Sequence, residues 1–269
     1  MAVPTAFILG GSADIGMALI ERYLAAGWRV AATHRRPGAL DRFAKHAAFR
    51  AFPLDLDRPD TFETAAAAFG ATGWRWNLFV AATGDLAPVG PFLELDGAQW
   101  QAAIDRNAFL PCRVLQRMHA LRDASGVQSA AFFAGGGTNN PFRNYSAYAV
   151  SKLALIKMCE LLDDEIADLK CFILGPGYVA SKLHRATLDA GARAGDNLKK
   201  TTDFMGTPGT SMDDVFACLE WCRAQDRDTI GGRNVSVVHD PWRGGGAGLA
   251  AALRADRDLF KLRRKGLAP

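Results

Sequence analysis

The chain has 269 residues, of which 49% are hydrophobic and 22% are charged, an ordinary composition for a globular protein. Its 32 basic and 28 acidic residues give a net charge of +4, which is too small to indicate nucleic-acid binding. No apolar run is long enough to span a membrane, and the start Met1-Ala2-Val3-Pro4 lacks the features of a signal peptide. We therefore expect a cytoplasmic protein that binds neither nucleic acid nor membranes.

The five cysteines are scattered and mostly flanked by apolar residues. Cys218 and Cys222 lie one helical turn apart, but no His or further Cys stands nearby to complete a metal site. This usage is typical of small buried side chains in a reducing compartment. We expect no metal.

The first unit predicted along the chain is a strand, a glycine-rich turn, a helix and a second strand. The strand covers Thr5 to Leu9, the helix Met17 to Ala26 and the second strand Trp28 to Thr33. A unit of this kind is typical of dinucleotide binding, with the pyrophosphate at the helix N-terminus. The glycines of the turn let the backbone approach the phosphates, where a Cβ would intrude.

The alternation of strands and helices continues through the rest of the chain. The further predicted strands are Ala48 to Leu54, Asn77 to Ala82, Gln128 to Ala134, Leu169 to Leu174 and Val235 to Val238. The further predicted helices are Asp60 to Phe69, Gly97 to Arg122 and Ala147 to Ile166. With no linker between them, these elements predict one α/β domain over residues 1–269. Its expected fold is a Rossmann-like, doubly wound, mostly parallel seven-stranded sheet with helices on both faces.

Two segments depart from this alternation. Residues 178–212 hold several Gly and Pro among polar residues, and a long insertion after a strand is typical of a substrate lid. An oligomer contact or a disordered loop is the alternative. Residues 241–269 form a C-terminal extension whose predicted helix needs a surface for its apolar residues, and a neighbouring subunit would offer one. Those residues are Leu253, Leu259, Phe260 and Leu262.

Tyr148 and Lys152 lie near the start of a helical run that neither Gly nor Pro interrupts. Residues four apart share a face of a helix, so the phenol and the ammonium point the same way. A nearby cation and a helix N-terminus both favour the phenolate, so we expect the pKa of Tyr148 to fall below its ordinary value of ~10. Such a tyrosine suits proton transfer to a carbonyl or from an alcohol. Alone, the pair is weak evidence, because this spacing also occurs by chance on solvated helices.

Taken together, these patterns resemble the short-chain dehydrogenase/reductase family, in its single-domain branch, from Thr5 to about Asp240. The glycine turn of the family is matched by Gly10, Ile15 and Gly16, and its Tyr-x-x-x-Lys motif by Tyr148 and Lys152. The segment Ala81-Ala82-Thr83-Gly84 takes the place of the family's Asn-Asn-Ala-Gly. The resemblance implies that Asn107 is the active-site Asn and that Asp55 holds the adenine. It also assigns to the cofactor site Ser12, Asp14, Ala82, Gly84, Pro176, Gly177, Val179 and Ser181.

Two departures from the family pattern bear on chemistry. Asp14 stands where the family has its middle glycine, and we expect its carboxylate to turn away from the pyrophosphate and cap the helix. The position of the catalytic Ser falls on Gly135, and the loss of one such hydrogen-bond donor typically costs ~3 kcal/mol. Thr138 is the candidate substitute donor, with the amides of Asn139 and Asn140 as alternatives. The remaining interpretation is a turn with no catalytic part.

The end of the second predicted strand indicates which nicotinamide cofactor is used. An Asp or Glu there would hold the ribose 2′-hydroxyl of NAD(H). This chain instead has His34, Arg35 and Arg36, and no acid until Asp41. Arginine pairs with a phosphate in a bidentate way, so NADP(H) is favoured over NAD(H), with Arg35 as the main contact and His34 or Arg36 assisting.

The predicted function is that of an NADP(H)-dependent oxidoreductase that interconverts a carbonyl and an alcohol by hydride transfer. The resemblance implies that Tyr148 is the acid/base, that Lys152 lowers its pKa and holds the ribose, and that Asn107 positions a water in a proton relay. The lid leans basic, which indicates either a small polar or anionic, sugar-like substrate or, more simply, a solvated lid face. The resemblance also implies a homo-dimer or homo-tetramer. The alternatives are a catalytically weakened NADP(H)-binding sensor or regulator and a sugar epimerase or dehydratase.

Overall fold

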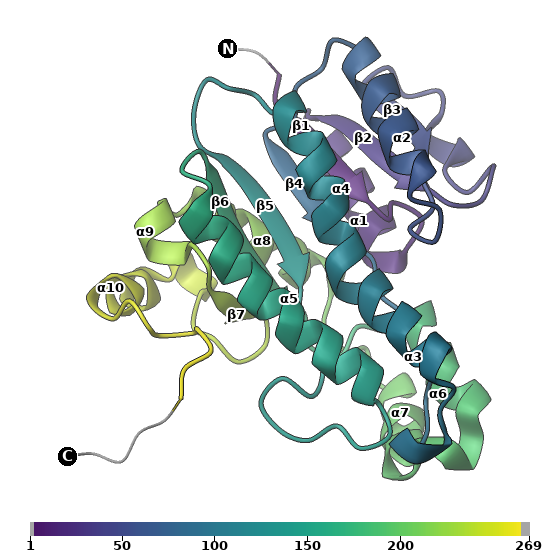
Figure 1. Ribbon diagram of the computed structural model, residues 1–269. Helices are drawn as coiled ribbons and strands as arrows, with labels where there is room; N and C mark the ends of the chain where they lie inside the picture. Colours follow the sequence, from purple (N-terminus) through teal and green to yellow (C-terminus); the bar gives the residue numbers. More distant parts are fainter. Residues whose placement is uncertain (1–2, 265–269) are drawn as a thin grey trace.

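Seven strands form a single sheet in the computed structural model, which describes residues 3–264. The strand order is β3-β2-β1-β4-β5-β6-β7, and every neighbouring pair is parallel (Figure 1). The predicted doubly wound sheet is therefore confirmed, and it is wholly rather than mostly parallel. The strands are Thr5–Leu9 (β1), Arg29–His34 (β2), Phe49–Pro53 (β3), Leu78–Ala81 (β4), Gln128–Phe133 (β5), Leu169–Gly175 (β6) and Asn234–Ser236 (β7).

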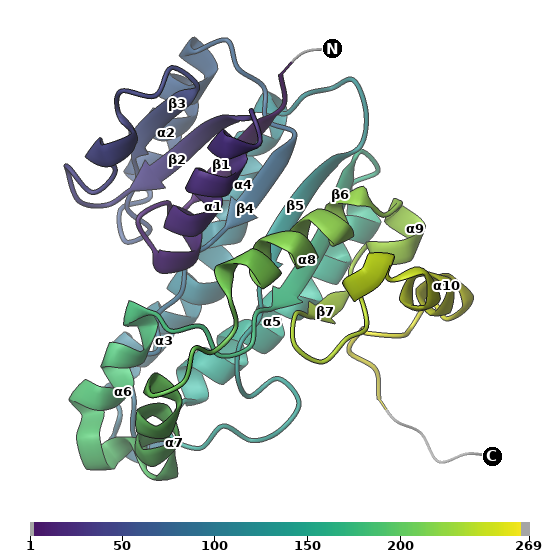
Figure 2. The same ribbon diagram turned by 180° about the vertical axis from the view of Figure 1, so that it is seen from behind.

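Helices cover both faces of this sheet. Figure 1 shows α2, α4 and α5 in front of the strands, and Figure 2 shows α1 and α8 on the opposite face. The short helix α9 and the helix α10 lie at the β7 edge. The helices are Asp14–Ala25 (α1), Asp60–Ala71 (α2), Gly97–Ile104 (α3), Leu110–Met118 (α4), Ser146–Glu165 (α5), Arg185–Ala190 (α6), Asp196–Met205 (α7), Met212–Ala224 (α8), Arg227–Ile230 (α9) and Ala247–Ala255 (α10).

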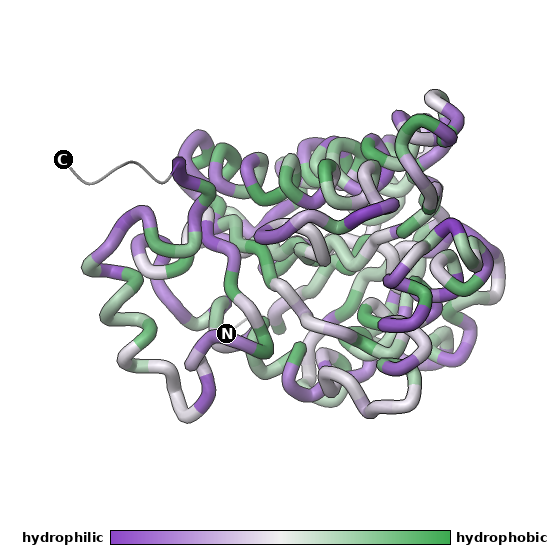
Figure 3. Tube along the Cα trace, turned by 90° about the horizontal axis from the view of Figure 1, so that it is seen from below, coloured by the Kyte–Doolittle hydropathy of each residue, from purple (hydrophilic) through white to green (hydrophobic). Residues whose placement is uncertain are grey.

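The central strands β1 and β4 are buried along their whole length because helices cover both of their faces, whereas the edge strand β3 exposes Arg50, Ala51 and Pro53. Successive side chains of a strand point to opposite faces, so β1 sends Ile8 into one core and Phe7 and Leu9 into the other. The helices bury one side each, and their hydropathy alternates along the chain in Figure 3. Within the described residues, no helix combines the length and the apolar character that crossing a membrane requires.

Some predicted boundaries move. The helix after the glycine turn begins at Asp14 rather than Met17, and the last strand covers Asn234–Ser236 rather than Val235 to Val238. The predicted helix from Gly97 to Arg122 is interrupted by a π-helical turn at Asp105–Phe109, which joins α3 to α4. π-Helical turns are frequent at functional sites, and this one carries Asn107.

The C-terminal extension buries its apolar residues within the same chain. Helix α10 ends at Ala255, so only Leu253 of the four apolar residues expected on it is helical. Leu253 is fully buried in the core that α1 and α8 cover, and Leu259 and Phe260 pack against the same core, while Leu262 packs against the other. The surface that these side chains need is therefore supplied by the chain itself, and they do not call for a neighbouring subunit.

Residues 178–212 are largely helical rather than an open loop. Helices α6 and α7 lie side by side, next to α3 and beyond the carboxyl ends of the strands, as Figures 1 and 2 show. Two 3-10 turns, Lys182–His184 and Gly191–Ala194, precede and connect them. This arrangement puts the segment beside the edge of the sheet where ligands bind in folds of this kind.

Candidate active site

A crevice of about 1280 Å3 opens at the carboxyl ends of the strands. It lies beyond the end of β1, where the strand order reverses, because β2 lies on one side of β1 and β4 on the other. Doubly wound sheets bind their ligands at this position. All the site residues predicted from the sequence line it except Gly16 and Arg36. The structure therefore brings residues from 10 to 181 of the chain to one place.

The glycine turn is shaped for close approach. Gly10 has a φ of +81°, and its N–H donates to the Thr33 side chain at the end of β2. A Cβ on Gly16 would overlap the carbonyl oxygen of Gly10, so Gly16 serves to pack α1 against the turn and does not itself line the crevice. The first N–H groups of a helix have no partner within the helix, and those of α1 face this turn. Such a cradle fits the pyrophosphate of a dinucleotide.

Asp14 does not cap helix α1. The residue preceding the helix is Ala13, whose side chain makes no capping bond, and Asp14 is the first helical residue. Its carboxylate instead accepts a hydrogen bond of 2.7 Å from the backbone N–H of Lys182, in the 3-10 turn that follows β6. The Lys182 ammonium lies 4.0 Å from the other carboxylate oxygen. The prediction of capping is therefore wrong, because a partner distant in sequence takes the carboxylate.

The end of β2 presents cationic and aromatic groups to the crevice. His34 and Arg35 line it, whereas Arg36 does not. The His34 ring is held 2.9 Å from the carbonyl of Arg36 through Nδ1. Asp55 lies across from them after β3, and its carboxylate accepts from the N–H of Asp57. These residues are in a position to meet the adenosine half of a dinucleotide.

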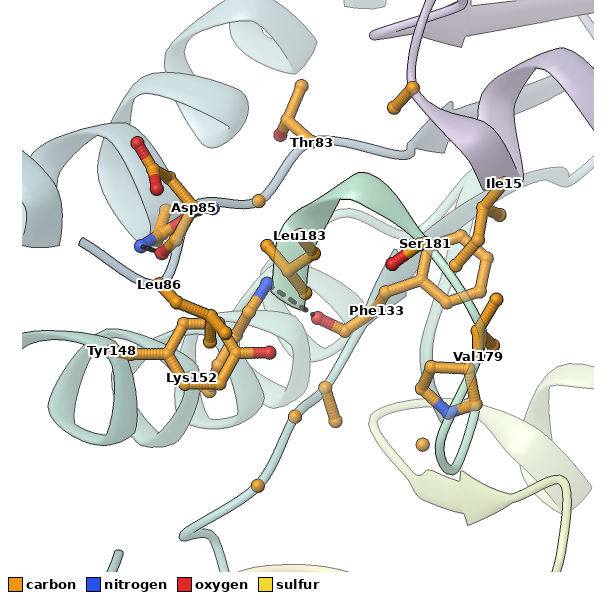
Figure 4. Close-up of a pocket in the computed structure, with 18 of the residues that line it drawn as sticks. Ile15, Thr83, Asp85, Leu86, Phe133, Tyr148, Lys152, Val179, Ser181 and Leu183 are labelled. Carbon is orange, nitrogen blue, oxygen red and sulfur yellow. Dashed lines mark hydrogen bonds between the residues drawn. The ribbon is translucent and has the colours of Figure 1, made fainter. Parts of the chain in front are cut away.

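The hydroxyl of Thr83 was missed as a candidate. Thr83 lines the crevice between Ala82 and Gly84, and its Oγ1 is buried without a hydrogen-bond partner among the described residues (Figure 4). A buried unpaired hydroxyl is costly, so a ligand that pairs with it gains free energy. The signal in the sequence is a hydroxyl residue where the family motif has Ala.

Tyr148 and Lys152 lie on the first turns of α5, and both are buried, with exposed fractions of 6% and 2%. The Lys152 ammonium lies 5.6 Å from the centroid of the Tyr148 ring and donates a 3.0 Å hydrogen bond to the carbonyl oxygen of Phe133. Figure 4 shows both side chains directed toward the end of β5. The helix therefore brings the phenol and the ammonium together as the spacing predicts.

The expected lowering of the Tyr148 pKa is wrong. Burial raises the pKa of Tyr148 from 10.0 to about 12, because desolvation penalises the phenolate. Burial also lowers the pKa of Lys152 from 10.5 to about 8, because desolvation penalises the ammonium. The sequence shows the cation beside the phenol but not the loss of water around both groups. At neutral pH the phenol therefore carries its proton.

The side chain of Asn107 is fully engaged with one backbone segment. Its Oδ1 accepts from the N–H of Asp85 and its Nδ2 donates to the carbonyl of Asp85, both at 2.8 Å. The residue is buried in the π-helical turn and lines the crevice. This pairing fixes the loop after β4 against α3 and α4. A role for Asn107 in a proton relay stays a prediction.

The turn that follows β5 lies against the start of α5 and lines the crevice. Thr138, Asn139 and Asn140 all line it, and their side chains form no hydrogen bonds with other described residues. Whether Thr138 substitutes for the missing Ser stays a prediction.

Apolar side chains surround the phenol, and the sequence did not indicate them. Tyr148 belongs to a separate hydrophobic cluster with Leu86, Val89 and the fully buried Tyr145, packed by Phe142, Leu183 and small residues of α6. The Phe142 ring stacks on Tyr145 at 4.2 Å, and the Tyr145 hydroxyl donates to Thr187 of α6. No short motif marks such a wall, because its residues come from four separate segments.

Pro176, Gly177 and Val179 follow the end of β6 at Gly175 and line the crevice together with Ser181. Tyr178 stacks between His184 and Phe204, with ring centroids 4.3 and 4.7 Å away. Three parts of the segment 178–212 are thus joined by one aromatic stack at the mouth of the crevice.

A doubly wound parallel sheet with a crevice at the carboxyl ends of its strands is the arrangement of a dinucleotide-binding α/β protein. A family model described as "short chain dehydrogenase" matches residues 4–190, more than half of the sequence. The chain belongs to the short chain dehydrogenase family and is an oxidoreductase that acts on small molecules.

Curated relatives are distant. Galactitol 2-dehydrogenase (L-tagatose-forming) of Cereibacter sphaeroides is 27% identical over 184 residues, covering 66% of this chain and 72% of that protein. The 3-oxoacyl-[acyl-carrier-protein] reductase MabA of Mycobacterium bovis is 23% identical over 232 residues, covering 86% and 89%. Among solved structures, the KRED1-Pglu enzyme superposes with a TM-score of 0.77 at 24% identity, covering 87% of this chain and all of that one. The similarity to the KRED1-Pglu enzyme supports the assignment of the fold.

Proposed function

We propose that this protein is an NADP(H)-dependent enzyme that interconverts a carbonyl and an alcohol by hydride transfer, with Tyr148 as acid/base. The observation that supports this most is the buried pair of Tyr148 and Lys152 at the edge of the dinucleotide crevice. A bound nicotinamide would supply or accept the hydride. The protein itself must supply the proton, the orientation of the substrate and the exclusion of water.

In the reducing direction, Tyr148 donates its proton to the oxygen of the carbonyl as negative charge develops there. The raised pKa of the phenol keeps this proton in place at neutral pH. Lys152, held 3.0 Å from the Phe133 carbonyl, provides a positive charge near the phenolate that forms. In the oxidising direction Tyr148 must first lose its proton, so that direction gains from alkaline pH.

Arg35 supports NADP(H) as the cofactor. Arg35 lines the crevice at the end of β2, no acidic residue occupies this strand end, and a ribose 2′-phosphate would pair with its guanidinium. The hydroxyl of Thr83 and the first N–H groups of α1 would hold other parts of the dinucleotide.

The substrate has an apolar side and a polar side. The cluster of Leu86, Phe142 and Leu183 around Tyr148 favours a hydrocarbon portion next to the reacting carbonyl. Arg185 and Lys200 of α6 and α7 line the same crevice and favour a polar or anionic portion farther out. A small polar metabolite, such as a sugar-like one, remains the proposed class, and the named relatives that act on galactitol and on a 3-oxoacyl group both handle a carbonyl–alcohol pair.

The test is NADPH oxidation, followed by its absorbance, with a panel of ketoses, ketoacids and apolar ketones. We expect turnover of at least one class, and a loss of about 100-fold or more in kcat for Tyr148→Phe, because the proton donor is removed. Arg35→Ala should weaken NADPH binding by about tenfold or more and leave NADH binding unchanged.

A catalytically weakened NADP(H)-binding regulator is the second candidate, favoured by Gly135 in place of the catalytic Ser. Tight NADPH binding by titration, together with no oxidation of NADPH by any member of the panel, would replace the first proposal with this one. A homo-dimer or homo-tetramer is proposed for either function.

A further inference from the structure

Gly135, directly after Ala134 at the end of β5, is in contact with the phenol of Tyr148. A Cβ on Gly135 would overlap the phenol oxygen and would lie 2.6 Å from Cζ and 2.7 Å from Cε1 of the same ring. Real Cβ atoms essentially never come within 3.0 Å of another heavy atom. No side chain therefore fits at position 135 while Tyr148 is where the structure places it.

The backbone does not explain why position 135 is a glycine. Its φ lies outside the left-handed region, in contrast to Gly137 two residues later, whose φ is +87°. An alanine or a serine would therefore cause no backbone strain at 135. What the glycine provides is the space that the phenol occupies.

The ring of Tyr148 is held in this place from several sides. Phe142 meets it edge-on with centroids 6.4 Å apart, and the ring packs in the apolar cluster with Leu86 and Leu183. The Lys152 ammonium, tied to the Phe133 carbonyl, lies on its other side. A displaced phenol would lose these contacts.

We propose that Gly135 is a positioning residue for Tyr148. Without a side chain at 135, the phenol oxygen occupies the space at the end of β5 in which the family has its serine. One phenol thus meets the substrate oxygen where the family uses a serine and a tyrosine. This inference rests on the proposed function. Its consequence is that restoring the serine displaces the acid/base and lowers the rate.

The experiment combines Gly135→Ala with Tyr148→Ala in a double-mutant cycle, read by melting temperature. We expect Gly135→Ala to lower the melting temperature by about 3–6 °C when Tyr148 is present, because overpacking of this kind is destabilising. When Tyr148→Ala is also present, Gly135→Ala should lower the melting temperature by less than about 1 °C. Gly126→Ala, before β5, is the control, since its Cβ would meet nothing within 4 Å and its φ is not positive, so its cost should not depend on Tyr148.

The kinetic arm uses Gly135→Ser. We expect kcat to fall by about tenfold to 100-fold, with a smaller change in KM, because a displacement of about 1 Å at the reacting groups can cost ~100-fold in rate. A higher kcat for Gly135→Ser would overturn the inference, since it would show that the wild type merely lacks the contribution of a serine and that Gly135 does not position Tyr148. An equal melting-temperature cost of Gly135→Ala in both backgrounds would overturn it too. The melting-temperature cycle gives its answer even if no carbonyl is turned over, so it is separate from a failure of the proposed function.

Discussion

Two ionisable side chains, Tyr148 and Lys152, are buried side by side, and their pKa values move in opposite directions. Desolvation raises the pKa of the phenol to about 12 and lowers that of the ammonium to about 8. Both shifts favour the neutral form of the group. The phenol of Tyr148 therefore keeps its proton at neutral pH. The ammonium of Lys152 has a pKa low enough that it loses its proton in mildly alkaline solution.

The shift at Lys152 predicts a dependence of stability on pH. Between pH 8 and 10.5 the unfolded state binds more protons at this lysine than the folded state does. The free energy of unfolding therefore rises as the pH rises. The free energy of unfolding of the wild type, minus that of Lys152→Met, should rise by about 1–2 kcal/mol between pH 7.5 and 9.5. Urea denaturation measures both values. Burial also lowers the pKa of Lys170 to about 8 and raises the pKa of Cys159 well above its ordinary value, but the contributions of both residues cancel in this difference. A constant difference over this range would contradict the prediction.

The residue types of the site could be predicted from the sequence, and their environments could not. The motifs place Tyr148, Lys152 and the glycine turn correctly, because their chemistry depends on spacing within one element. The sign of the Tyr148 pKa shift depends on how much water the folded chain removes, which no local pattern contains. The overlap of the phenol with position 135 likewise depends on contacts across the site.

At the scale of elements, the bond between Asp14 and Lys182 connects the start of α1 to the turn after β6. It joins residues 168 positions apart across the mouth of the dinucleotide crevice. The same carboxylate lies where a pyrophosphate would approach the helix N-terminus. It therefore holds the segment 178–212 in place and also adds a negative charge close to the cofactor site.

Two variants separate these effects. Asp14→Ala removes the acceptor, and we expect tryptic cleavage after Lys182 and Arg185 to become about fivefold to tenfold faster. Asp14→Asn keeps an oxygen that accepts from the Lys182 N–H, so its cleavage should stay close to that of the wild type. Both variants should bind NADPH more tightly at low salt, because a repulsive charge is lost. Equal cleavage rates for all three proteins would show that the bond does not hold the segment.

The elements themselves followed well from the sequence. Apolar runs bounded by glycine and polar residues identified all seven strands, with boundaries off by one or two residues. The π-helical turn around Asn107 was not predicted, because a single widened turn leaves the hydrophobic period almost unchanged. Helices α6 and α7 were also missed, since the Gly and Pro residues that flank them are typical of loops, and helix α8 was not predicted either.

At the scale of the whole molecule, the C-terminal extension is joined to the sheet by a buried arginine. Arg233, before β7, has an exposed fraction of 1% and donates to the carbonyl oxygens of Leu253, Asp256 and Leu259. These carbonyls lie at the end of α10 and just after it, where they have no helical partner. The arginine therefore fixes the extension against the sheet, so that Phe260 and Leu262 also line the crevice.

Replacing this arginine should affect the whole fold. Arg233→Met leaves three carbonyl groups without a donor, and we expect a loss of about 2–4 kcal/mol in the free energy of unfolding. Arg254→Met is the control, because Arg254 makes only a half-exposed pair with Asp226 and should change stability by less than about 0.5 kcal/mol. Calorimetry would compare the two. Similar melting temperatures would mean that the buried arginine is not needed.

The wholly parallel sheet has a consequence for how the protein acquires its activity. No two neighbouring strands can pair as a hairpin, so each pairing must wait for a crossover segment to fold between them. During synthesis on the ribosome, β1 to β3, whose ends line the half of the crevice proposed for the adenosine, emerge early, whereas Tyr148, the proposed acid/base, lies 95 residues beyond the end of β3 at Pro53. A partly made chain can therefore collapse around its nucleotide-binding half long before it has anything to catalyse with.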